Sequence, residues 1–202
     1  MNETKEKILD IAEELFFTKG YEVTPVSEIL EKAGIAKGTL YHHFKNKEDI
    51  LDEVIQRQGH RFFSKAKEVA EDKTIPANER LILTLMSMMA ESKMDNEELD
   101  KIHHPQNALM HEKINDFILK YATPFLTEII EDGKKDKIFN TPYPKQVVEM
   151  IWIYVNVAFD HLSATSPEEM KTKVEAFIFN IYRLTGAKEG SLDFSEILRG
   201  LK

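Results

Sequence analysis

Apolar residues recur along almost the whole chain at spacings of three and four, which is the period of an α-helix that buries one face. Residues 4–19 show this pattern clearly: Ile8, Leu15 and Phe16 fall on one stripe, and Gly20 follows as a helix stop. No sustained alternation of apolar and polar positions, the mark of a strand, is present in the sequence. The pattern therefore predicts an all-α protein.

Turn and cap residues divide the first quarter of the chain into short helices. Thr24 is the predicted N-cap of the second helix, and Pro25 is its predicted first residue, where a missing N–H has no cost. That helix ends near Gly34, which begins a tight turn. A third, short helix follows, and Asn46 is the predicted N-cap of a fourth helix that runs to about Glu71.

The third helix, residues 37–44, has one apolar face and one polar face. Leu40 and Phe44 are four residues apart and share the apolar face. We expect this face to pack on Ile29, Ala33 and Ile35. A short helix, a Gly-containing turn and a second helix of this kind form the helix-turn-helix pattern, in which the second helix enters the major groove of DNA.

The rest of the chain predicts a second set of helices, which begins near the turn-rich residues 74–76. A further turn-rich segment, residues 140–144, precedes two strongly apolar helices. Asp193 and Glu196 form a capping-box pattern that would open a short last helix. The helices expected in this part of the chain cover residues 76–93, 97–103, 106–121, 123–133, 145–162 and 167–184.

Composition narrows the class of protein. Apolar residues make up 42% of the chain and charged residues 31%, which is typical of soluble globular proteins. The absence of cysteine excludes disulfides, thiolate metal sites and a cysteine nucleophile. The first residues lack the apolar stretch of a signal peptide, and the longest apolar run, residues 150–158, is too short to cross a bilayer. We therefore expect a cytoplasmic protein with no membrane partner.

The distribution of charge matters more than its sum. The net charge of −8 argues at first against a nucleic-acid partner, because phosphate contacts require lysine and arginine. Residues 19–47, however, contain five lysines against three glutamates, whereas the rest of the chain contains 22 basic and 32 acidic residues. Positive charge is thus concentrated in the predicted helix-turn-helix.

Residues 33–51, with the sequence AGIAKGTLYHHFKNKEDIL, resemble the signature of the tetracycline-repressor (TetR) family. The resemblance extends back through residues 8–17 and covers about the first quarter of the chain. It implies a ligand-responsive transcriptional regulator, a repressor that a small molecule releases from a palindromic operator in double-stranded DNA. An effector that is a protein or a metal, or no effector, remains the alternative.

The resemblance also implies which residues contact DNA. A small residue at the start of the groove-facing helix lets its backbone approach the bases, and a threonine can pair with several base edges. The residues expected near the bases are Lys37, Gly38, Thr39 and His42. Those expected on the phosphate backbone are Thr24, Ser27, Tyr41, His43, Lys45 and Lys47.

The same resemblance implies a DNA-binding domain over residues 1–47 and an effector-binding and dimerisation domain over residues 48–202. Two-fold repressors bind paired half-sites, so a homodimer is expected. The last two long helices have apolar stripes that could pair with their copies in a four-helix bundle. The residues expected in this dimer interface are Val148, Ile151, Val155, Val174, Phe177, Ile178, Ile181 and Tyr182.

Large or soft apolar side chains in the middle helices, with a few polar groups, favour a small-molecule pocket, although such a stripe is also typical of plain core. The identity of the ligand does not follow from them. The residues expected to line the pocket are Phe62, Phe63, Met86, Met89, Phe117, Tyr121, Trp152, Asn156 and Phe159.

Metal-dependent and enzymatic functions have little support in the sequence. His103, His104 and His111 lie near one another, but Pro105 interrupts the helical step between them and no ordered carboxylates accompany them. The chain contains no nucleophile elbow, Gly-rich phosphate loop or His-Glu-x-x-His motif. We therefore expect no catalytic activity, no cofactor and no metal site.

Overall fold

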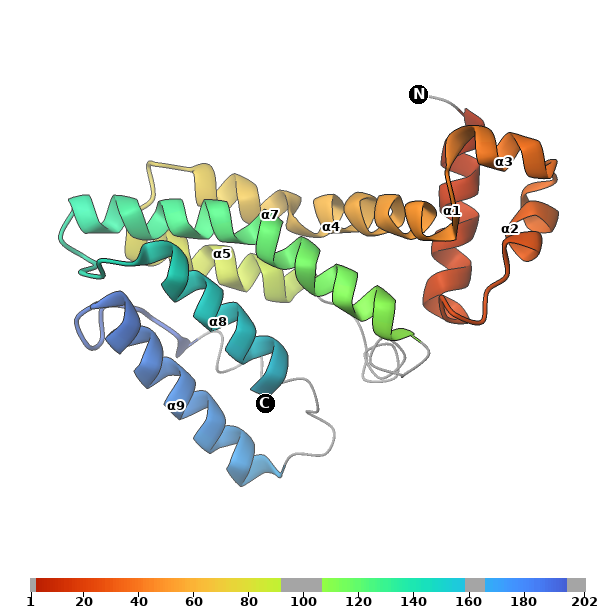
Figure 1. Cartoon of the computed structure of the whole chain (residues 1–202). Coiled ribbons are helices and arrows are strands. Elements are labelled where there is room, and N and C mark those ends of the chain that lie inside the picture. Colours follow the sequence, from red (N-terminus) through yellow and green to blue (C-terminus); the bar gives the residue numbers. More distant parts are fainter. Residues whose placement is uncertain (1–2, 92–106, 159–165, 196–202) are drawn as a thin grey trace. The chain divides into compact units, whose positions relative to one another are not determined.

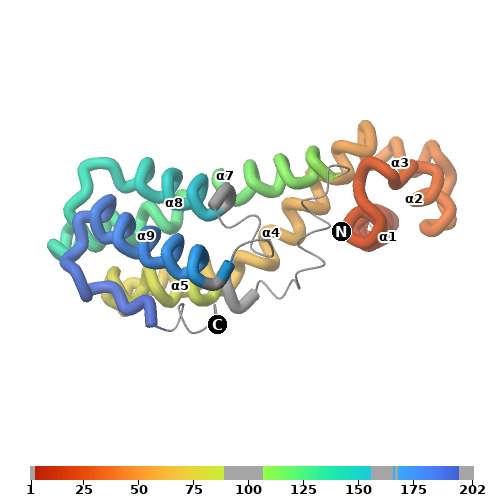
Figure 2. The backbone as a smooth tube through the Cα atoms, turned by 90° about the horizontal axis from the view of Figure 1, so that it is seen from below, coloured from red at the N-terminus to blue at the C-terminus, as the bar shows by residue number. Residues whose placement is uncertain are grey.

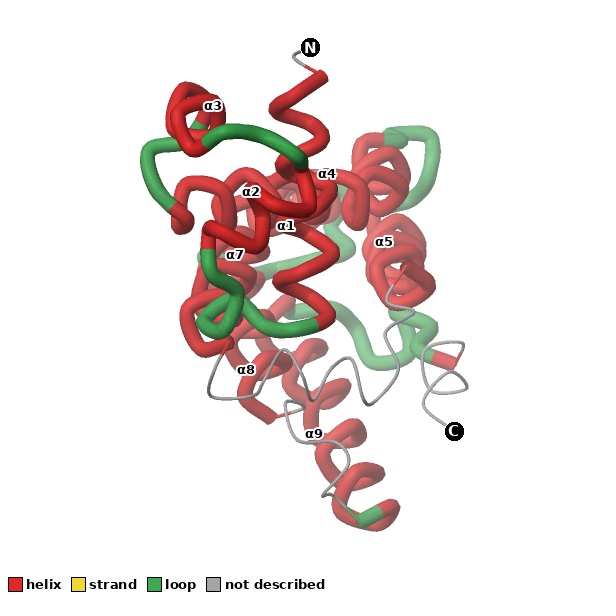
Figure 3. The backbone as a smooth tube through the Cα atoms, turned by 90° about the vertical axis from the view of Figure 1, so that its right-hand side faces the viewer, coloured by secondary structure: helices red, strands yellow, loops and turns green. Residues whose placement is uncertain are grey.

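The computed structural model describes residues 3–91, 107–158 and 166–195. Every regular element in these ranges is a helix, and Figure 3 shows helices and loops but no strand among them. The prediction of an all-α fold is confirmed. Within the same ranges, no helix combines the length and the apolar composition that a membrane span requires.

The chain forms two compact units, which we describe separately. The first consists of Met1–Arg61 with Met94–Phe117, and the second of Phe62–Lys93 with Ile118–Lys202. Two long helices, α4 (Lys47–Glu71) and α7 (Ala108–Lys135), contribute residues to both units. By packing, the first unit thus extends beyond residue 47, the boundary expected from the helix-turn-helix alone.

The first unit is built around α1 (Glu3–Thr18), against which α2 (Val26–Ala33) and α3 (Lys37–His43) both pack, as Figure 1 shows. The early turns of α4 complete its core. The start of α7 also contributes, because Met110 is fully buried in the same cluster. The buried residues of this core include Ile8, Leu15, Phe16, Tyr21, Ile29, Leu40, Phe44, Ile50, Leu51, Val54 and Met110.

Of the two helix caps predicted from the sequence, the cap of α2 differs in the structure and the cap of α4 agrees. The prediction that Thr24 caps α2 is wrong: Pro25 is the N-cap residue, in an extended conformation, and no side chain caps this helix. The Thr24 hydroxyl instead donates to the carbonyl of Gly20 at 2.7 Å. The prediction for Asn46 is confirmed, because its Oδ1 accepts the N–H of Asp49 at 2.8 Å.

The second unit contains α5 (Ala77–Glu91), the later part of α7, α8 (Pro144–Ala158) and α9 (Pro167–Thr185). Helices α8 and α9 lie side by side (Figure 2). Phe63, near the end of α4, is buried beside the rings of Tyr121 and Phe125. The buried Arg80 donates to Asp132 at 2.7 Å and so joins α5 to α7.

The two helices expected over residues 106–121 and 123–133 are one continuous helix, α7, with Pro124 inside it. Pro124 is exposed, so water can solvate the carbonyl that loses its intrahelical bond. Gly133 does not end the helix either. A Cβ atom at Gly133 would collide with the ring of Phe139, so glycine is required there by packing. The expected helix over residues 97–103 and the capping residue Glu196 lie outside the described residues.

Candidate nucleic-acid interface

Helix α3 has a buried face and an exposed face. Leu40 is fully buried and Phe44 nearly so, in the cluster that contains Ile29, and Ile35 packs against it. Ala33 is buried as well. The predicted packing of α3 is therefore confirmed. The exposed residues of the segment are Lys37, Gly38, Tyr41, His42 and Lys45, and Thr39 and His43 are half-buried.

Gly38 lies in the first turn of α3, beside open space. Apart from Gly38 itself, its two neighbours and the adjacent helix backbone, no described atom lies within 4 Å of the position that a Cβ atom would occupy. Glycine inside a helix destabilises it by roughly 0.5–1 kcal/mol relative to alanine. Packing within the chain therefore leaves room for a side chain at this position and does not itself require glycine.

The lysines of this segment are not equally available. Lys19 pairs with Glu28 at 2.7 Å, and Lys32 pairs with Glu14 at 2.9 Å. Among the described residues, no carboxylate pairs with Lys37 or Lys45. The ammonium of Lys37 lies 5.7 Å from the centre of the Tyr41 ring, one turn further along α3. Fewer than the five lysines of this segment are therefore free of a carboxylate partner.

Lys47 points into the first unit, although the sequence predicted a phosphate contact. Its Nζ donates to the carbonyls of Tyr21 at 2.8 Å and Thr24 at 3.2 Å, and it lies 4.1 Å from the centre of the Tyr21 ring. Burial lowers the pKa of Lys47, and the charge of Glu22 opposes this shift. The described contacts of Lys47 are thus with its own chain, where the sequence predicted a phosphate contact.

Thr24 is the other expected backbone contact that conflicts with the structure, because its side chain is fully buried and its hydroxyl is bonded to Gly20. Ser27 is exposed at the start of α2. His43 lies between two rings, 5.1 Å from that of His42 and 6.4 Å from that of Phe44. Ser27, Tyr41, His43 and Lys45 thus remain as candidates for phosphate contacts.

One guanidinium of α4 bonds to three carboxylates of α1. Arg57 of α4 donates to Asp10 at 2.7 Å and contacts Glu6 and Glu13, all three on α1. Burial alone would lower the pKa of Arg57, but the hydrogen bonds and charges of Glu13 and Asp10 raise it. The arginine therefore stays charged and sets the position of α4 beside the helix on which α2 and α3 pack.

The apolar stripes of α8 and α9 are used within the chain. Val148, Val174 and Ile181, expected in a dimer interface, are buried in the second unit, because a stripe of this period packs the two helices on their own unit. The remaining expected residues, Ile151, Val155, Phe177, Ile178 and Tyr182, are half-buried. The large apolar side chains that stay exposed on α8 and α9 are Met150, Ile153, Tyr154 and Phe179.

The expected pocket residues whose side chains the structure describes do not line either of its two described pockets. The rings of Phe62 and Tyr121, both half-buried, pack against that of the buried Phe63 in the second unit. Phe117 belongs to the first unit, where its ring fills the space beside Gly59. Met86 and Trp152 are half-buried and line no described pocket. The side chains of Met89 and Asn156, and Phe159 as a whole, lie outside the described residues.

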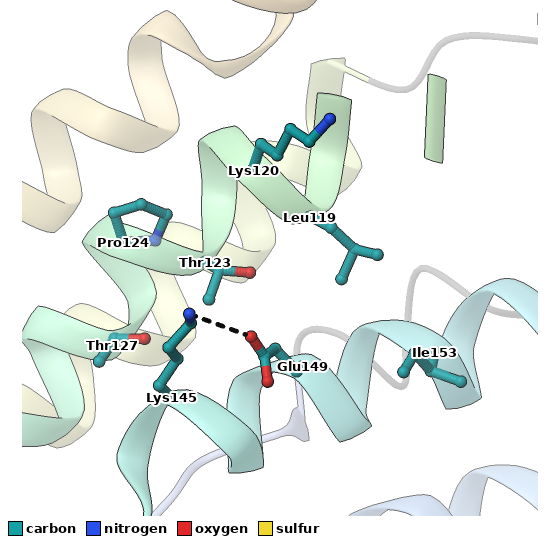
Figure 4. Close-up of a pocket in the computed structure, with 8 residues that line it drawn as sticks. All are labelled: Leu119, Lys120, Thr123, Pro124, Thr127, Lys145, Glu149 and Ile153. Atoms are coloured by element: carbon teal, nitrogen blue, oxygen red, sulfur yellow. Dashed lines mark ion pairs between the residues drawn. The ribbon is translucent and has the colours of Figure 1, made fainter. Parts of the chain in front are cut away.

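A groove of about 600 Å³ lies between α7 and α8 instead, and Figure 4 shows its lining. Lys145 and Glu149 of α8 form an ion pair of 3.5 Å on one side. The hydroxyls of Thr123 and Thr127, on α7, are buried and have no hydrogen-bond partner among the described residues. The residues lining the groove are Leu119, Lys120, Thr123, Pro124, Thr127, Lys145, Glu149 and Ile153.

The threonine hydroxyls make the groove a candidate binding site. A buried hydroxyl without a partner destabilises a protein by about 1–3 kcal/mol, and a bound polar group removes this penalty. Thr123 and Thr127 are four residues apart, so they project from the same side of α7. This spacing, together with Pro124, was a signal in the sequence that periodic patterns of apolar residues do not detect.

Metal ligands do not gather in the part of the chain that the structure describes: no group of three histidine, aspartate or glutamate side chains could hold an ion there. The ring of His111 lies 3.4 Å from the side-chain nitrogen of Asn115. His103 and His104 lie outside the described residues.

Known families match both parts of the chain. The model described as bacterial regulatory proteins of the tetR family matches residues 8–54, and the one described as a tetracyclin repressor-like C-terminal domain matches residues 90–179. The two matches together include the helix-turn-helix, α7, α8 and most of α9. The chain belongs to the TetR family of bacterial regulatory proteins.

Individual relatives agree with this assignment. The fatty acid metabolism regulator protein of Bacillus subtilis is 29% identical over 148 residues, which are 70% of this chain and 76% of its own length. An HTH-type transcriptional regulator of Staphylococcus aureus is 33% identical over 97 residues, about half the length of each protein.

Solved structures show the same fold. The fatty acid degradation regulator FadR of Bacillus halodurans has a TM-score of 0.61 at 24% identity, over 92% of this chain and 95% of its own. Reduced NemR of Escherichia coli has a TM-score of 0.60 at 16% identity, over 93% of this chain and 100% of its own.

Proposed function

We propose that this protein is a ligand-responsive transcriptional regulator that binds a palindromic DNA operator as a homodimer and is released from it by a small molecule. The observation that carries the proposal is the exposed face of α3. There, Gly38 leaves open space beside the helix, and Lys37 and Lys45 have no carboxylate partner among the described residues. Its curated relatives are named as regulators, and we propose no catalytic activity and a cytoplasmic site of action.

The residues of α3 divide by the chemistry they offer to DNA. Lys37, Thr39 and His42 would read base edges in the major groove, where lysine prefers guanine and threonine is less selective. Gly38 would allow the helix backbone to approach closely. Phosphates would be contacted by Ser27, Tyr41, His43 and Lys45. These contacts would set the register of the helix-turn-helix on the duplex.

A second copy of the chain is the proposed partner of the exposed apolar residues on α8 and α9. Large apolar side chains that gather on one surface are typical of protein interfaces. Met150, Ile153 and Tyr154 on α8 and Phe179 on α9 are all more than one third exposed in the single chain. A dimer through this surface would supply two helix-turn-helix motifs, one for each half of a palindrome.

The effector is proposed to bind in the groove between α7 and α8. Leu119 and Pro124 offer it an apolar lining, and the two threonine hydroxyls offer hydrogen bonds. This combination suits an elongated apolar molecule with a polar end. The Bacillus subtilis relative is named for fatty acid metabolism, which favours a fatty acid or a derivative of one as the effector.

Binding to DNA can be tested directly. Fluorescence anisotropy with the DNA upstream of the gene should show specific binding that weakens steeply as salt rises. A fatty acid series of increasing chain length should then raise the melting temperature of the free protein and dissociate the complex. Absence of any complex at low salt would contradict the proposal, whereas binding without release by these compounds would contradict only the effector.

A further inference from the structure

The turn between α1 and α2 has few hydrogen bonds within itself, although the ring of Tyr21 packs against that of Phe16. It covers residues 21–24 and leads directly into α2, which no side chain caps. Its local bonds are the N–H of Thr24 to the carbonyl of Tyr21, at 3.2 Å, and the Thr24 hydroxyl to Gly20. Since α2 begins where the turn ends, the position of the helix-turn-helix depends on how this turn is held.

One side of the turn is held from α4. The ammonium of Lys47 bonds the carbonyls of both Tyr21 and Thr24 and lies over the Tyr21 ring. An ammonium offers three hydrogens, and two of them are used by these carbonyls. If Lys47 turned outward to a phosphate, it would leave both carbonyls without this donor and remove the cation from the ring.

The other side of the turn is held from a residue far along the chain. Asn107, immediately before α7, is 2% exposed, and its Oδ1 accepts the N–H of Tyr21 at 2.9 Å. Met110, one turn later, is buried in the same core as Tyr21. Thus the N–H of Tyr21 is bonded by Asn107, and its carbonyl and ring are contacted by Lys47.

The start of α7 is also fixed to α4. Lys113 donates to Asp52 at 2.6 Å and pairs with Glu48 at 2.8 Å. Burial alone would lower the pKa of Lys113, but its hydrogen bonds with Asp52 and Glu48 raise the pKa well above its usual range. A charged Lys113 therefore keeps Asn107 beside the turn that Lys47 holds from the other side.

We propose that Lys47 and Asn107 are positioning residues for DNA binding, which hold the turn of residues 21–24 between them, and that withdrawal of Asn107 with the start of α7 releases the helix-turn-helix. The proposal rests on the proposed function only in that DNA is bound by α3. In this proposal Lys47 makes no phosphate contact. A change in α7 reaches the helix-turn-helix through residues 107–113.

The dependence of operator affinity on salt distinguishes a positioning lysine from one that binds phosphate. Loss of a phosphate contact lowers the slope of log affinity against log salt by about one, because one fewer counterion is released. K47M keeps the length of the side chain and removes its charge. We expect K47M to lower affinity about tenfold with an unchanged slope. K45M, on the exposed Lys45, is the control and should lower the slope.

Asn107 is tested with two variants of similar size. N107L removes the acceptor for the Tyr21 N–H, whereas N107D keeps it. N107L should lower affinity about tenfold without a change of slope, and N107D should restore most of the loss. In the free protein, hydrogen exchange at the Tyr21 amide should be faster in N107L than in wild type and N107D. This measurement needs no DNA, so it tests the hydrogen bond between Tyr21 and Asn107 even if no operator is bound.

Each result decides one of the two proposals. If K47M lowers the salt slope as K45M does, or if K47M and N107L bind like wild type, the positioning role is wrong while the regulator proposal stands. If wild type binds no DNA, the regulator proposal fails. Hydrogen exchange at the Tyr21 amide then still tests whether Asn107 holds the turn. Should K47M not fold, N107L tests the same turn from the other side.

Discussion

Gly38 and Leu40 lie two positions apart on α3, yet Leu40 is fully buried while a Cβ atom at Gly38 would meet no described side chain within 4 Å. One residue holds the helix on its own protein, and the other leaves room for a partner. Because these two roles fall on different residues, substitutions can separate stability from DNA binding.

Gly38→Ala should stabilise the free protein and weaken its complex with the operator. Removal of glycine from a helix contributes roughly 0.5–1 kcal/mol, but the added methyl group would fill the space that DNA needs. We expect a higher melting temperature together with a loss of affinity of about tenfold or more, measured by calorimetry and fluorescence anisotropy. Gly34→Ala is the control: its φ of 63° would strain alanine and lower stability. Operator affinity of G38A equal to that of wild type would show that nothing approaches this position.

His42→Ala should relax sequence preference without a change in stability. The side chain is exposed on α3, so the fold does not depend on it. If His42 contacts a base edge, its loss should reduce the discrimination between the operator and a variant at one base pair by about 1–3 kcal/mol. Competition binding with a set of single-base operator variants would measure this difference. A uniform loss against every variant would instead place His42 on the phosphate backbone.

Asp132→Asn should destabilise the second unit in a pH-dependent way. Hydrogen bonds from Lys73, Lys135 and Arg80 keep the pKa of Asp132 well below its usual value, against the opposing effect of burial. A carboxyl of this kind stabilises the fold above its unfolded pKa, about 3.9, and the contribution is lost as pH falls through the lower folded value.

The D132N variant should therefore lose roughly 2–3 kcal/mol of unfolding free energy at neutral pH, less than a fully buried pair because Asp132 is partly exposed. The difference from wild type should shrink below about pH 4. Urea unfolding at several pH values checks both expectations, with D136N, at an exposed neighbour, as the control. A difference that stays constant down to pH 2 would show that the Asp132 charge is not responsible.

Ile153→Glu should yield a monomer that still folds. The side chain is 56% exposed in the single chain, so a charge there costs little in the monomer, but it would be desolvated between two copies. Analytical ultracentrifugation should show half the mass of wild type, and operator affinity should fall with it. Lys171→Glu on α9, at an exposed polar position, is the matched control. A dimeric I153E would exclude this face of α8 from the interface.

The double substitution of Thr123 and Thr127 by valine should abolish the response to effector and raise stability. It removes two buried hydroxyls that have no partner among the described residues and leaves the size of the side chains unchanged. Thermal shift by fatty acids should be lost, while operator binding in their absence stays intact. Thr172→Val, at an exposed position on α9, should respond like wild type. An unchanged thermal shift in the double variant would place the effector elsewhere.

The features that could be predicted from the sequence are those set by neighbours along the chain. Leu40 and Phe44 share a face because of helical geometry, and Asn46 caps α4 through a residue three positions away. The hydrogen bond between Asn107 and Tyr21 joins residues 86 positions apart, and no local pattern contains it. The inward direction of Lys47 depends on the same long-range packing.

Periodicity also fails to say what covers an apolar face. Val148 and Val174 were expected against a second copy, and they are buried by their own chain, while Ile153 and Phe179 on the same helices remain exposed. Two helices were expected over residues 106–121 and 123–133, but α7 is continuous through both ranges and contains Pro124. In each case tertiary contacts outweighed a local preference.

The ion pairs of Lys19 with Glu28 and of Lys32 with Glu14 affect how the protein would search a chromosome. Attraction to random DNA grows with the number of phosphates neutralised, whatever the base sequence. The helix-turn-helix has only a few unpaired lysines, and the whole chain has a net charge of −8. The protein would therefore dissociate quickly from random DNA. Long residence would then be confined to the operator, where base contacts are added, and little of the protein would be held on the rest of the genome.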